Sequence, residues 1–318
     1  MRLKLKLKLK LKSFICIALF IMLLACSGKA AKEESPESLF ELGLNYLKGN
    51  DSLDIDMDKE KGIALIRRSA EQGDAAAQSN LGNAYYTGEG VPQDYVQAAY
   101  WYRKAAEQGV ALAQNNLGVC YDNGEGVSQD YVQAVSWWCK AADQGYAPAQ
   151  LNLGNAYYKG KGVSQDYVQA VIWYYNAADQ GYAPAQFSLG SCYYNGEGVP
   201  QDYRQAVYWW CKAAEQGSAA AQNNLGNAYY KGKGVSQDYV QAVFWYRKAA
   251  EQGYADAQYN LGFCYCEGEG VSQDYTQAVY WLRKAAEQGN ADAQFLLEGC
   301  YCYGEGVTRD YTGLLLVA

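Results

Sequence analysis

The chain has 318 residues, of which 34 are acidic and 27 basic, so its formal net charge at pH 7 is −7. This acidic balance argues against nucleic acid as a partner, because phosphate backbones are bound by clusters of lysine and arginine. The chain contains no histidine, which excludes a Ser-His-Asp or Cys-His catalytic site and removes the commonest zinc ligand. We therefore expect neither a metal nor a cofactor.

The first 26 residues have the pattern of an export signal. Leucine and lysine alternate up to residue 12, and an apolar run over residues 13–25 leads to Cys26. A basic segment, a short apolar segment and a small residue before a cysteine predict a lipoprotein signal peptide, which is cleaved before Cys26 so that its thiol can carry lipid. An uncleaved membrane helix is disfavoured, because about 13 apolar residues are too few to span a bilayer.

These features predict an exported, membrane-anchored lipoprotein, located at the outer membrane or periplasm or at the cell surface. Ser27 after the cysteine resembles outer-membrane sorting more than inner-membrane retention. Residues 27–37 are mostly polar and small and form the predicted tether. Residues 38–76 form a degenerate first copy of a repeat that becomes regular at residue 77: Gly43 matches its first helix, and Asp58 is the predicted N-cap of its second.

One sequence of 36 residues then recurs six times without a gap over residues 77–292. Its most constant part, Gln-Asp-Tyr, begins at Gln93, Gln129, Gln165, Gln201, Gln237 and Gln273. A strict period of this length is the signature of stacked structural repeats. Residues 293–318 form a partial last repeat, in which Glu298 replaces a glycine. Its residues 314–318 either cap the stack or end a truncated helix.

Each repeat is predicted to contain two helices, here called helix A and helix B. Gln114, Leu117 and Gly118 follow the spacing of one helical face. Gly124 ends helix A, because glycine readily adopts the positive φ of a helix C-terminus. Asp130 is the predicted N-cap of helix B.

The buried stripe of helix B is predicted to contain Ala134, Trp137 and Ala141. Gly118 lacks a side chain, which lets Trp137 or its neighbours approach helix A closely. Trp173, one repeat further along, is likewise expected to be buried. Since a two-helix unit cannot bury its apolar face alone, the repeats must stack into a solenoid.

The pattern AxxQxxLGxxYxxGxGVxxDYxxAxxWxxKAAxxG runs through these repeats. It resembles the Sel1-like repeat, a 36-residue relative of the tetratricopeptide repeat, and the resemblance extends from about residue 39 to the C-terminus. The resemblance implies an all-α fold, namely a right-handed α/α superhelical solenoid of helix-turn-helix repeats. It also implies a protein-interaction scaffold rather than an enzyme.

Eight cysteines lie within the repeats, two in each of four repeats. Four of them share a helix-A position that alanine fills elsewhere, so buried thiols are expected there: Cys120, Cys192, Cys264 and Cys300. Cys139 and Cys211 share a position with arginines and are expected to be exposed. Because buried and exposed thiols are poor partners, we expect free or partly paired cysteines. Cysteine-rich relatives carry a disulfide in each repeat, but at positions held here by alanine and glutamine.

The Gly-x-Gly-Val turns superficially resemble phosphate-binding loops. Their middle residue changes from Glu125 to Lys161, Glu197 and Lys233. A phosphate site would not alternate its charge in this way, so these are predicted to be structural turns.

By analogy with tetratricopeptide arrays, helix-A residues that face away from helix B should line a concave groove. Asn amides pair with both N–H and C=O groups of an extended peptide, and Tyr offers rigid area with a polar tip. The predicted groove residues are Asn83, Tyr86, Asn115, Asn155, Tyr158, Tyr194, Asn223, Asn227 and Tyr230. The alternative is that duplication preserved these residues as solvated or inter-repeat positions without a ligand.

The first functional hypothesis is a non-catalytic scaffold, anchored to a bacterial membrane by lipidated Cys26, that holds a protein or peptide partner in the groove. The second is a glycan- or peptidoglycan-binding module, because Asn, Tyr and Trp surfaces also suit saccharides. An enzyme that interacts with β-lactams, as suggested for some cysteine-rich relatives, is least favoured because the sequence contains no Ser-x-x-Lys pair.

Overall fold

The computed structural model describes residues 35–50, 53 and 55–309. The predicted signal peptide with Cys26, residues 27–34 of the predicted tether and residues 310–318 lie outside the described residues. In the described ranges no helix is both long enough and apolar enough to cross a membrane.

Fifteen helices of 13 residues each make up the described ranges, which contain no strand apart from one isolated bridge between Asn50 and Ile55. Those in the helix-A position are α2 (Pro36–Lys48), α4 (Ala75–Thr87), α6 (Ala111–Asn123), α8 (Ala147–Lys159), α10 (Ala183–Asn195), α12 (Ala219–Lys231), α14 (Ala255–Glu267) and α16 (Ala291–Tyr303). Those in the helix-B position are α3 (Lys59–Glu71), α5 (Tyr95–Glu107), α7 (Tyr131–Asp143), α9 (Tyr167–Asp179), α11 (Tyr203–Glu215), α13 (Tyr239–Glu251) and α15 (Tyr275–Glu287).

The ends of these helices are set by the residues that the sequence singled out. The Asp130 carboxylate accepts hydrogen bonds from the backbone N–H groups of Val132 and Gln133, both at 3.0 Å, and so caps α7. Gly124 ends α6 in the left-handed conformation with φ 76°. In the first repeat Asp58 caps α3 in the same manner. These predicted caps are confirmed.

The chain divides into two compact units, Met1–Gln93 and Asp94–Ala318. In the first unit, α3 packs against both α2 and α4. Its core contains Leu39, Ile63 and Ile66, all at most 4% exposed. Gly43 lets α3 come close, since a Cβ at this position would lie 2.7 Å from the Ile66 side chain.

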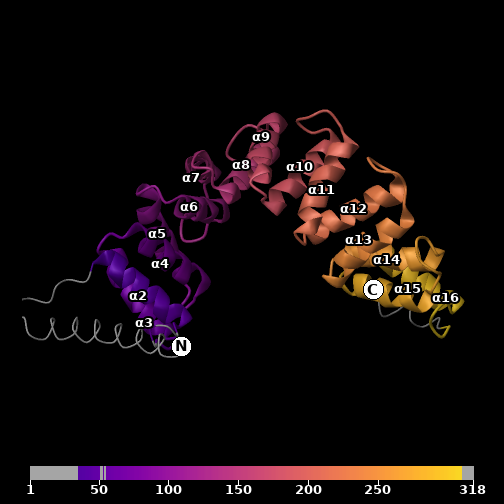
Figure 1. The fold of residues 1–318 in the computed structure, drawn as a ribbon, viewed down its shortest axis with the longest axis horizontal. Coiled ribbons are helices and arrows are strands. Elements are labelled where there is room, and N and C mark those ends of the chain that lie inside the picture. Colours follow the sequence, from indigo (N-terminus) through magenta and orange to yellow (C-terminus); the bar gives the residue numbers. More distant parts are fainter. Residues whose placement is uncertain (1–34, 51–52, 54, 310–318) are drawn as a thin grey trace, which may run out of the picture. The chain divides into compact units, whose positions relative to one another are not determined.

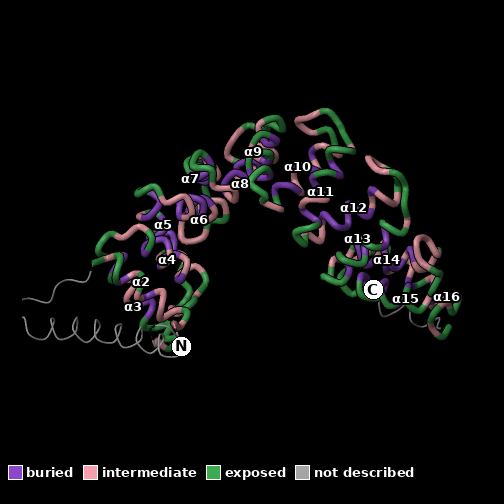
Figure 2. The backbone as a smooth tube through the Cα atoms, viewed as in Figure 1, coloured by how far each residue is buried: buried purple, intermediate pink, exposed green. Residues whose placement is uncertain are grey.

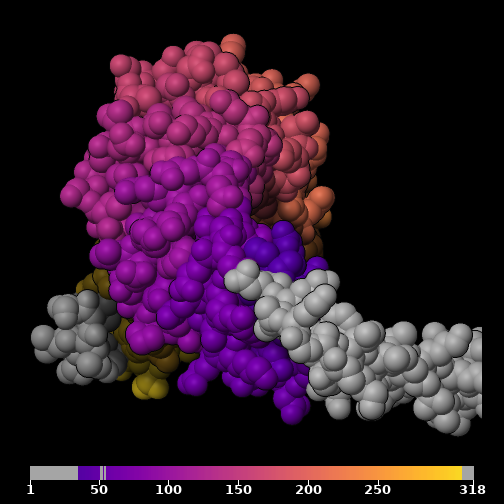
Figure 3. Space-filling view, turned by 90° about the vertical axis from the view of Figure 1, so that its left-hand side faces the viewer, coloured from indigo at the N-terminus to yellow at the C-terminus, as the bar shows by residue number. Residues whose placement is uncertain are grey.

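In the second unit, α5 to α16 follow one another in chain order, and each packs against the next (Figure 1). Buried residues lie along the facing sides of each helix pair, and exposed residues gather at the turns (Figure 2). In the space-filling view, the surface of this unit passes from purple through magenta to orange, so neighbouring parts of the surface come from consecutive repeats (Figure 3). The fold is an all-α solenoid of repeats of about 36 residues, as predicted.

The aromatic residue that packs on Gly118 is Trp138, not Trp137. Trp138 is 6% exposed, and a Cβ at Gly118 would lie 2.5 Å from its Nε1 atom. Trp137 is only half-buried, and Lys140 lies over its ring at 3.8 Å. The prediction that placed Trp137 in the buried stripe is therefore wrong by one residue, and Trp173 is likewise half-buried.

The Trp137 column has a different task, which is to join helix B to the preceding repeat. Trp173 packs against the core cluster that contains Trp138. Trp209 is buried within the cluster of Tyr174. This column therefore contributes to stacking between repeats rather than to the inside of one repeat.

The Gly-x-Gly turns are also packing elements. Gly126 has φ 72°, and any Cβ there would overlap the Tyr95 carbonyl of the preceding helix B. A glycine is therefore required both for the backbone conformation and for the close approach.

A buried glutamine ties each helix A to the helix B before it. Gln114 donates from Nε2 to the Ala106 carbonyl at 3.0 Å, while its Oε1 accepts from Gln144 Nε2 at 2.7 Å. The pattern recurs at Gln150, Gln186, Gln222 and Gln258. These amides are satisfied in the interior, as a buried polar group must be if it is not to destabilise the fold.

Candidate functional site

The predicted groove residues lie on helix A, and most of them make hydrogen bonds within the array. Asn155 Oδ1 accepts a hydrogen bond of 2.8 Å from the hydroxyl of buried Tyr174. Asn227 Oδ1 accepts the same bond from Tyr246, also at 2.8 Å. Among the described residues, only the side-chain oxygen of Asn227 takes part in a hydrogen bond, so its NH2 group can donate to a ligand.

The predicted groove tyrosines contact the turn of the following repeat. The Tyr158 hydroxyl donates to Glu197 at 2.8 Å, and that of Tyr230 donates to Glu269 at 2.5 Å. The Tyr194 hydroxyl instead accepts from Lys233 Nζ at 3.2 Å. Since a hydroxyl both donates and accepts, the same tyrosine position can pair with Glu197 or Glu269 in one turn and with Lys233 in another.

Asn115 and Asn223 are 7% and 5% exposed and lie between adjacent helices A. Asn152 Nδ2 donates to Asn115 Oδ1 at 3.0 Å, and Asn260 Nδ2 donates to Asn223 Oδ1 at 2.9 Å. Both amides therefore contribute to the contact between repeats, and a role in ligand binding stays a prediction for them.

Asn83 and Tyr86 lie on α4 in the first unit, where both are half-buried. The Tyr86 carbonyl accepts a hydrogen bond of 2.8 Å from Gln93 Nε2. They belong to a different compact unit from the other predicted groove residues.

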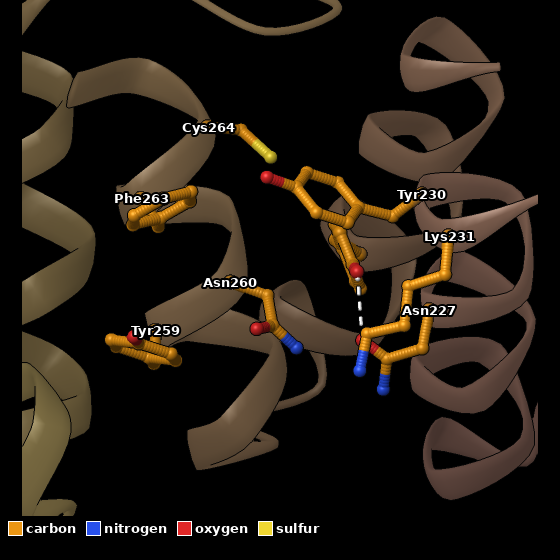
Figure 4. Close-up of a pocket in the computed structure, with 8 residues that line it drawn as sticks. Asn227, Tyr230, Lys231, Tyr259, Asn260, Phe263 and Cys264 are labelled. Carbon is orange, nitrogen blue, oxygen red and sulfur yellow. Dashed lines mark hydrogen bonds between the residues drawn. The ribbon is translucent and has the colours of Figure 1, made fainter. Parts of the chain in front are cut away.

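Two adjoining cavities open between helices A of the second unit. The first, here called the aromatic cavity, has a volume of about 220 Å³ and is lined by Asn227, Tyr230, Lys231, Tyr246, Tyr259, Asn260, Phe263 and Cys264. Asn227, Tyr230 and Lys231 extend from α12, and Asn260 and Cys264 extend from α14 (Figure 4). The rings of Tyr259 and Phe263 are 6.4 Å apart.

The second, here called the donor cavity, has a volume of about 280 Å³ and is lined by Ser191, Tyr194, Asn195, Trp210, Asn224, Asn227 and Lys231. Asn227 and Lys231 line both cavities. Of the described residues that line the donor cavity, none is acidic.

A larger cavity of about 540 Å³ lies at the C-terminal end of the described chain, against α14 and α16. There Glu298 stands where the other repeats have glycine, and Phe295 and Tyr303 are 74% and 76% exposed. Cys266, Cys300 and Cys302 also line it.

The cysteines of the described residues are free, as one of the expected outcomes had it. Burial raises the pKa of the Cys120, Cys192 and Cys264 thiols to about 12. Cys139 and Cys211 are half-buried rather than exposed, a correction to the prediction, and burial raises their thiol pKa as well. Thiols of this kind are poor nucleophiles.

The Cys266 thiol donates a hydrogen bond to Cys300, which raises the pKa of Cys266. Within the described ranges no group of three or more Cys, Asp or Glu side chains is arranged to hold a metal ion.

Paired helices, glycine turns and a ladder of buried amides define a helical-repeat solenoid. The sequence model of the Sel1 repeat matches the chain at residues 36–74, 75–110, 111–146, 147–182, 183–218, 219–254, 255–290 and 291–312. The chain therefore belongs to the Sel1 repeat family, whose solenoids are scaffolds typical of protein–protein interaction.

Two solved structures are similar over most of the chain. One is c5321 of uropathogenic Escherichia coli strains, a protective antigen, with 40% identity, a TM-score of 0.80 and coverage of 90% of this chain and 61% of that one. The other is a Sel1 repeat protein from Oxalobacter formigenes, with 38% identity, a TM-score of 0.67 and coverage of 89% and 81%. This chain thus spans about three fifths of the length of the first relative. The comparison with curated proteins gave no match.

The remaining cavity residues were not predicted from the sequence. Lys231 and Asn224 differ little from residues in other repeats, and no prediction was made for Trp210. A comparison of repeats could have indicated this site. Tyr194 and Ser191, which line the same cavity, occupy the positions that Asp122 and Val119 occupy two repeats earlier.

Proposed function

We propose that this chain is a non-catalytic scaffold that holds an extended peptide segment of a partner protein on the helix-A face of its second unit. The supporting observation is the pair of adjoining cavities between α10, α12 and α14, which share Asn227 and Lys231. Cavities at successive repeats suit a chain with regularly spaced side chains better than a compact metabolite.

The chemistry of the aromatic cavity supports a peptide ligand. Tyr259 and Phe263 offer apolar ring surface, and the Asn227 NH2 group offers a hydrogen-bond donor beside it. Small apolar pockets with a few oriented polar groups are typical of ligand sites. A side chain of the peptide would enter this cavity, and its backbone would bond to the amides.

We further propose that the chain is exported and attached to a bacterial membrane through lipid on Cys26. This rests on the sequence of residues 1–26 alone. The attachment would hold the scaffold at the membrane while the repeats contact the partner.

The experiment that tests the scaffold is selection of binders from a peptide library displayed on phage, with the full chain as bait. Tyr259→Leu and Phe263→Val place in the cavity the residues that the chain itself has at Leu151 and Val119. The double variant should therefore fold as wild type and lose the selected peptides.

The matched control is Tyr280→Ile, which replaces an exposed ring of helix B with the residue of the same column, Ile172. It should bind as wild type. Selected peptides that bind the double variant unchanged would contradict the proposed face. Binding of peptidoglycan fragments by a chain that selects no peptide would favour the glycan-binding alternative instead.

A further inference from the structure

Two copies of the same segment, 72 residues apart, differ in how many hydrogen-bond donors they leave free. Residues 115–159 and 187–231 have the same helices and turns. The later copy encloses the donor cavity.

The first difference concerns the indole N–H group. In the earlier copy Trp138 Nε1 donates to the Asn115 carbonyl at 3.2 Å. In the later copy the equivalent carbonyl, that of Phe187, accepts from the Ser191 hydroxyl at 3.0 Å. Trp210 is 3% exposed, and its Nε1 atom has no partner among the described residues. A buried donor in this state destabilises the fold, which favours a ligand or side-chain adjustment that satisfies it.

The second difference concerns an asparagine amide of the next helix A. In the earlier copy Asn152 donates to Asn115 Oδ1 at 3.0 Å. In the later copy Phe187 stands at the position of Asn115 and offers no side-chain acceptor. The Asn224 amide is thereby released to the donor cavity, which it lines.

The third difference is the charge. The earlier copy has Asp122 and Lys159 at the positions where the later copy has Tyr194 and Lys231. Tyr194 accepts from Lys233 and so keeps its own hydroxyl hydrogen to donate. Lys231 brings a positive charge, and Asn227 brings an NH2 group whose oxygen is already used by Tyr246.

We infer that the donor cavity binds a carboxylate group, in a ligand whose apolar side chain occupies the adjoining aromatic cavity. Among the described residues, the lining of this cavity contains several donors and one cation but no acidic side chain. Glu197 lies next to the lining, where it accepts from Asn195 Nδ2 at 3.1 Å. A carboxylate is an acceptor-only group that needs such donors when it leaves water. The inference rests on the proposed function in that the ligand is a peptide. The carboxylate comes either from the C-terminus of the peptide or from an Asp or Glu side chain.

The test uses fluorescein-labelled hexapeptides that bind the full chain, each made with a free C-terminus, with a C-terminal amide, and with every Asp and Glu changed to the amide. Binding is measured by fluorescence anisotropy. Loss of about tenfold or more in affinity is expected for one of the two changes, because a charge-assisted hydrogen bond is lost. Amidation of the terminus identifies the α-carboxylate, and the side-chain change identifies Asp or Glu.

Variants of the chain locate the effect. Lys231→Gln, at an exposed position, should lose about tenfold in affinity for the carboxylate peptide and none for the amide. Lys159→Gln makes the same change in the earlier copy and should have no effect. Tyr194→Asp gives the later copy the residue that the earlier copy has at Asp122. It should also weaken binding of the carboxylate peptide without weakening binding of the amide.

N-acetylphenylalaninate and its amide, followed by nuclear magnetic resonance, separate this proposal from the scaffold proposal. Binding of the acid that depends on Lys231, in a chain that binds no peptide, would support the carboxylate site and overturn the peptide scaffold. Peptides that bind equally well in all three forms would overturn the carboxylate site and leave the scaffold standing. Absence of binding by every probe would overturn both proposals. Equal losses of affinity in Lys159→Gln and Lys231→Gln would overturn the carboxylate site.

Discussion

The indole ring of Trp138 lies directly against the Cα atom of Gly118, so close that a Cβ at Gly118 would lie within 2.6 Å of two ring atoms. The same relationship joins Gly154 to Tyr174, Gly190 to Trp210, Gly226 to Tyr246 and Gly262 to Leu282. The Leu-Gly pair of each repeat therefore sets the distance between helix A and helix B, and a side chain at the glycine would force them apart.

Gly118→Ala should destabilise the chain by up to about 2 kcal/mol. Alanine gains about 1 kcal/mol of helix propensity over glycine, but overpacking against a rigid ring costs about 1–3 kcal/mol. The control is Gly299→Ala in α16, where a Cβ meets nothing within 4 Å and the substitution should stabilise by up to about 1 kcal/mol. Urea unfolding measures both. A stabilised Gly118→Ala chain would contradict the close approach of the two helices.

Tyr174→Ala should cost about 3–5 kcal/mol, the range for emptying a buried aromatic site. Tyr174 is 2% exposed, and its hydroxyl donates a hydrogen bond to Asn155 Oδ1. Trp173→Ala should cost less than about 3 kcal/mol, because Trp173 is half-buried. Hydrogen exchange should show the loss mainly in the mutated repeat and its neighbours. A larger loss for Trp173 than for Tyr174, or uniform loss across the array, would contradict this packing.

The folded chain should lose stability as the pH rises from about 9 to 12. Burial raises the pKa of Cys192 to about 12 from an ordinary value of 9.0, and the hydrogen bond to Glu197 raises that of Tyr158 to about 12 from 10.0. A raised pKa favours the protonated folded state, so its contribution is complete below the unfolded pKa and is lost as the pH rises through the folded one. Urea unfolding between pH 7 and 12 measures the decline.

Cys192→Ala is the control for this alkaline loss, since alanine fills the same position at Ala156 and Ala228. The variant should be folded at pH 7 and should lose stability less steeply above pH 9. An equally steep decline in the variant would show that the buried thiol does not contribute.

Cys26→Ala should leave the protein without lipid and largely release it from membranes, because the proposed attachment has no other source than this cysteine. Fractionation of cells into membrane and soluble parts measures the change, with Cys120→Ala as a control that keeps Cys26. Unchanged retention of Cys26→Ala in membranes would contradict the lipoprotein proposal.

The fold could be predicted because every local signal recurs with the same period. Asp130 and Gly124 set the helix ends by their own chemistry, so their roles follow from the sequence alone. The choice between Trp137 and Trp138 did not follow, because both are compatible with a helical spacing from Ala134 and Ala141. The position of the preceding repeat decides which ring packs between helix A and helix B of its own repeat and which ring packs against the repeat before it.

The candidate site was less accessible to sequence reasoning. Asn115 and Asn155 both belong to repeat positions at which asparagine recurs. Asn115 is nevertheless buried between repeats, whereas Asn155 accepts a hydrogen bond from the Tyr174 hydroxyl. The indole N–H group of Trp210 has no partner among the described residues, whereas that of Trp138 donates to the Asn115 carbonyl, although both residues occupy the same repeat position. Whether an asparagine amide has a partner depends on the residue one repeat away, as Asn224 depends on Phe187. The residues at one repeat position, taken alone, do not show this.

Within the second unit, extensive contacts join helices that are consecutive in the chain. The consequence is kinetic. A repeat needs only the residues just before and after it, so folding can follow the chain as it leaves the ribosome or an export channel, without waiting for distant segments. Only the newest stretch would then expose its apolar stripe at any moment, and an array of such repeats can lengthen without becoming slower to begin folding.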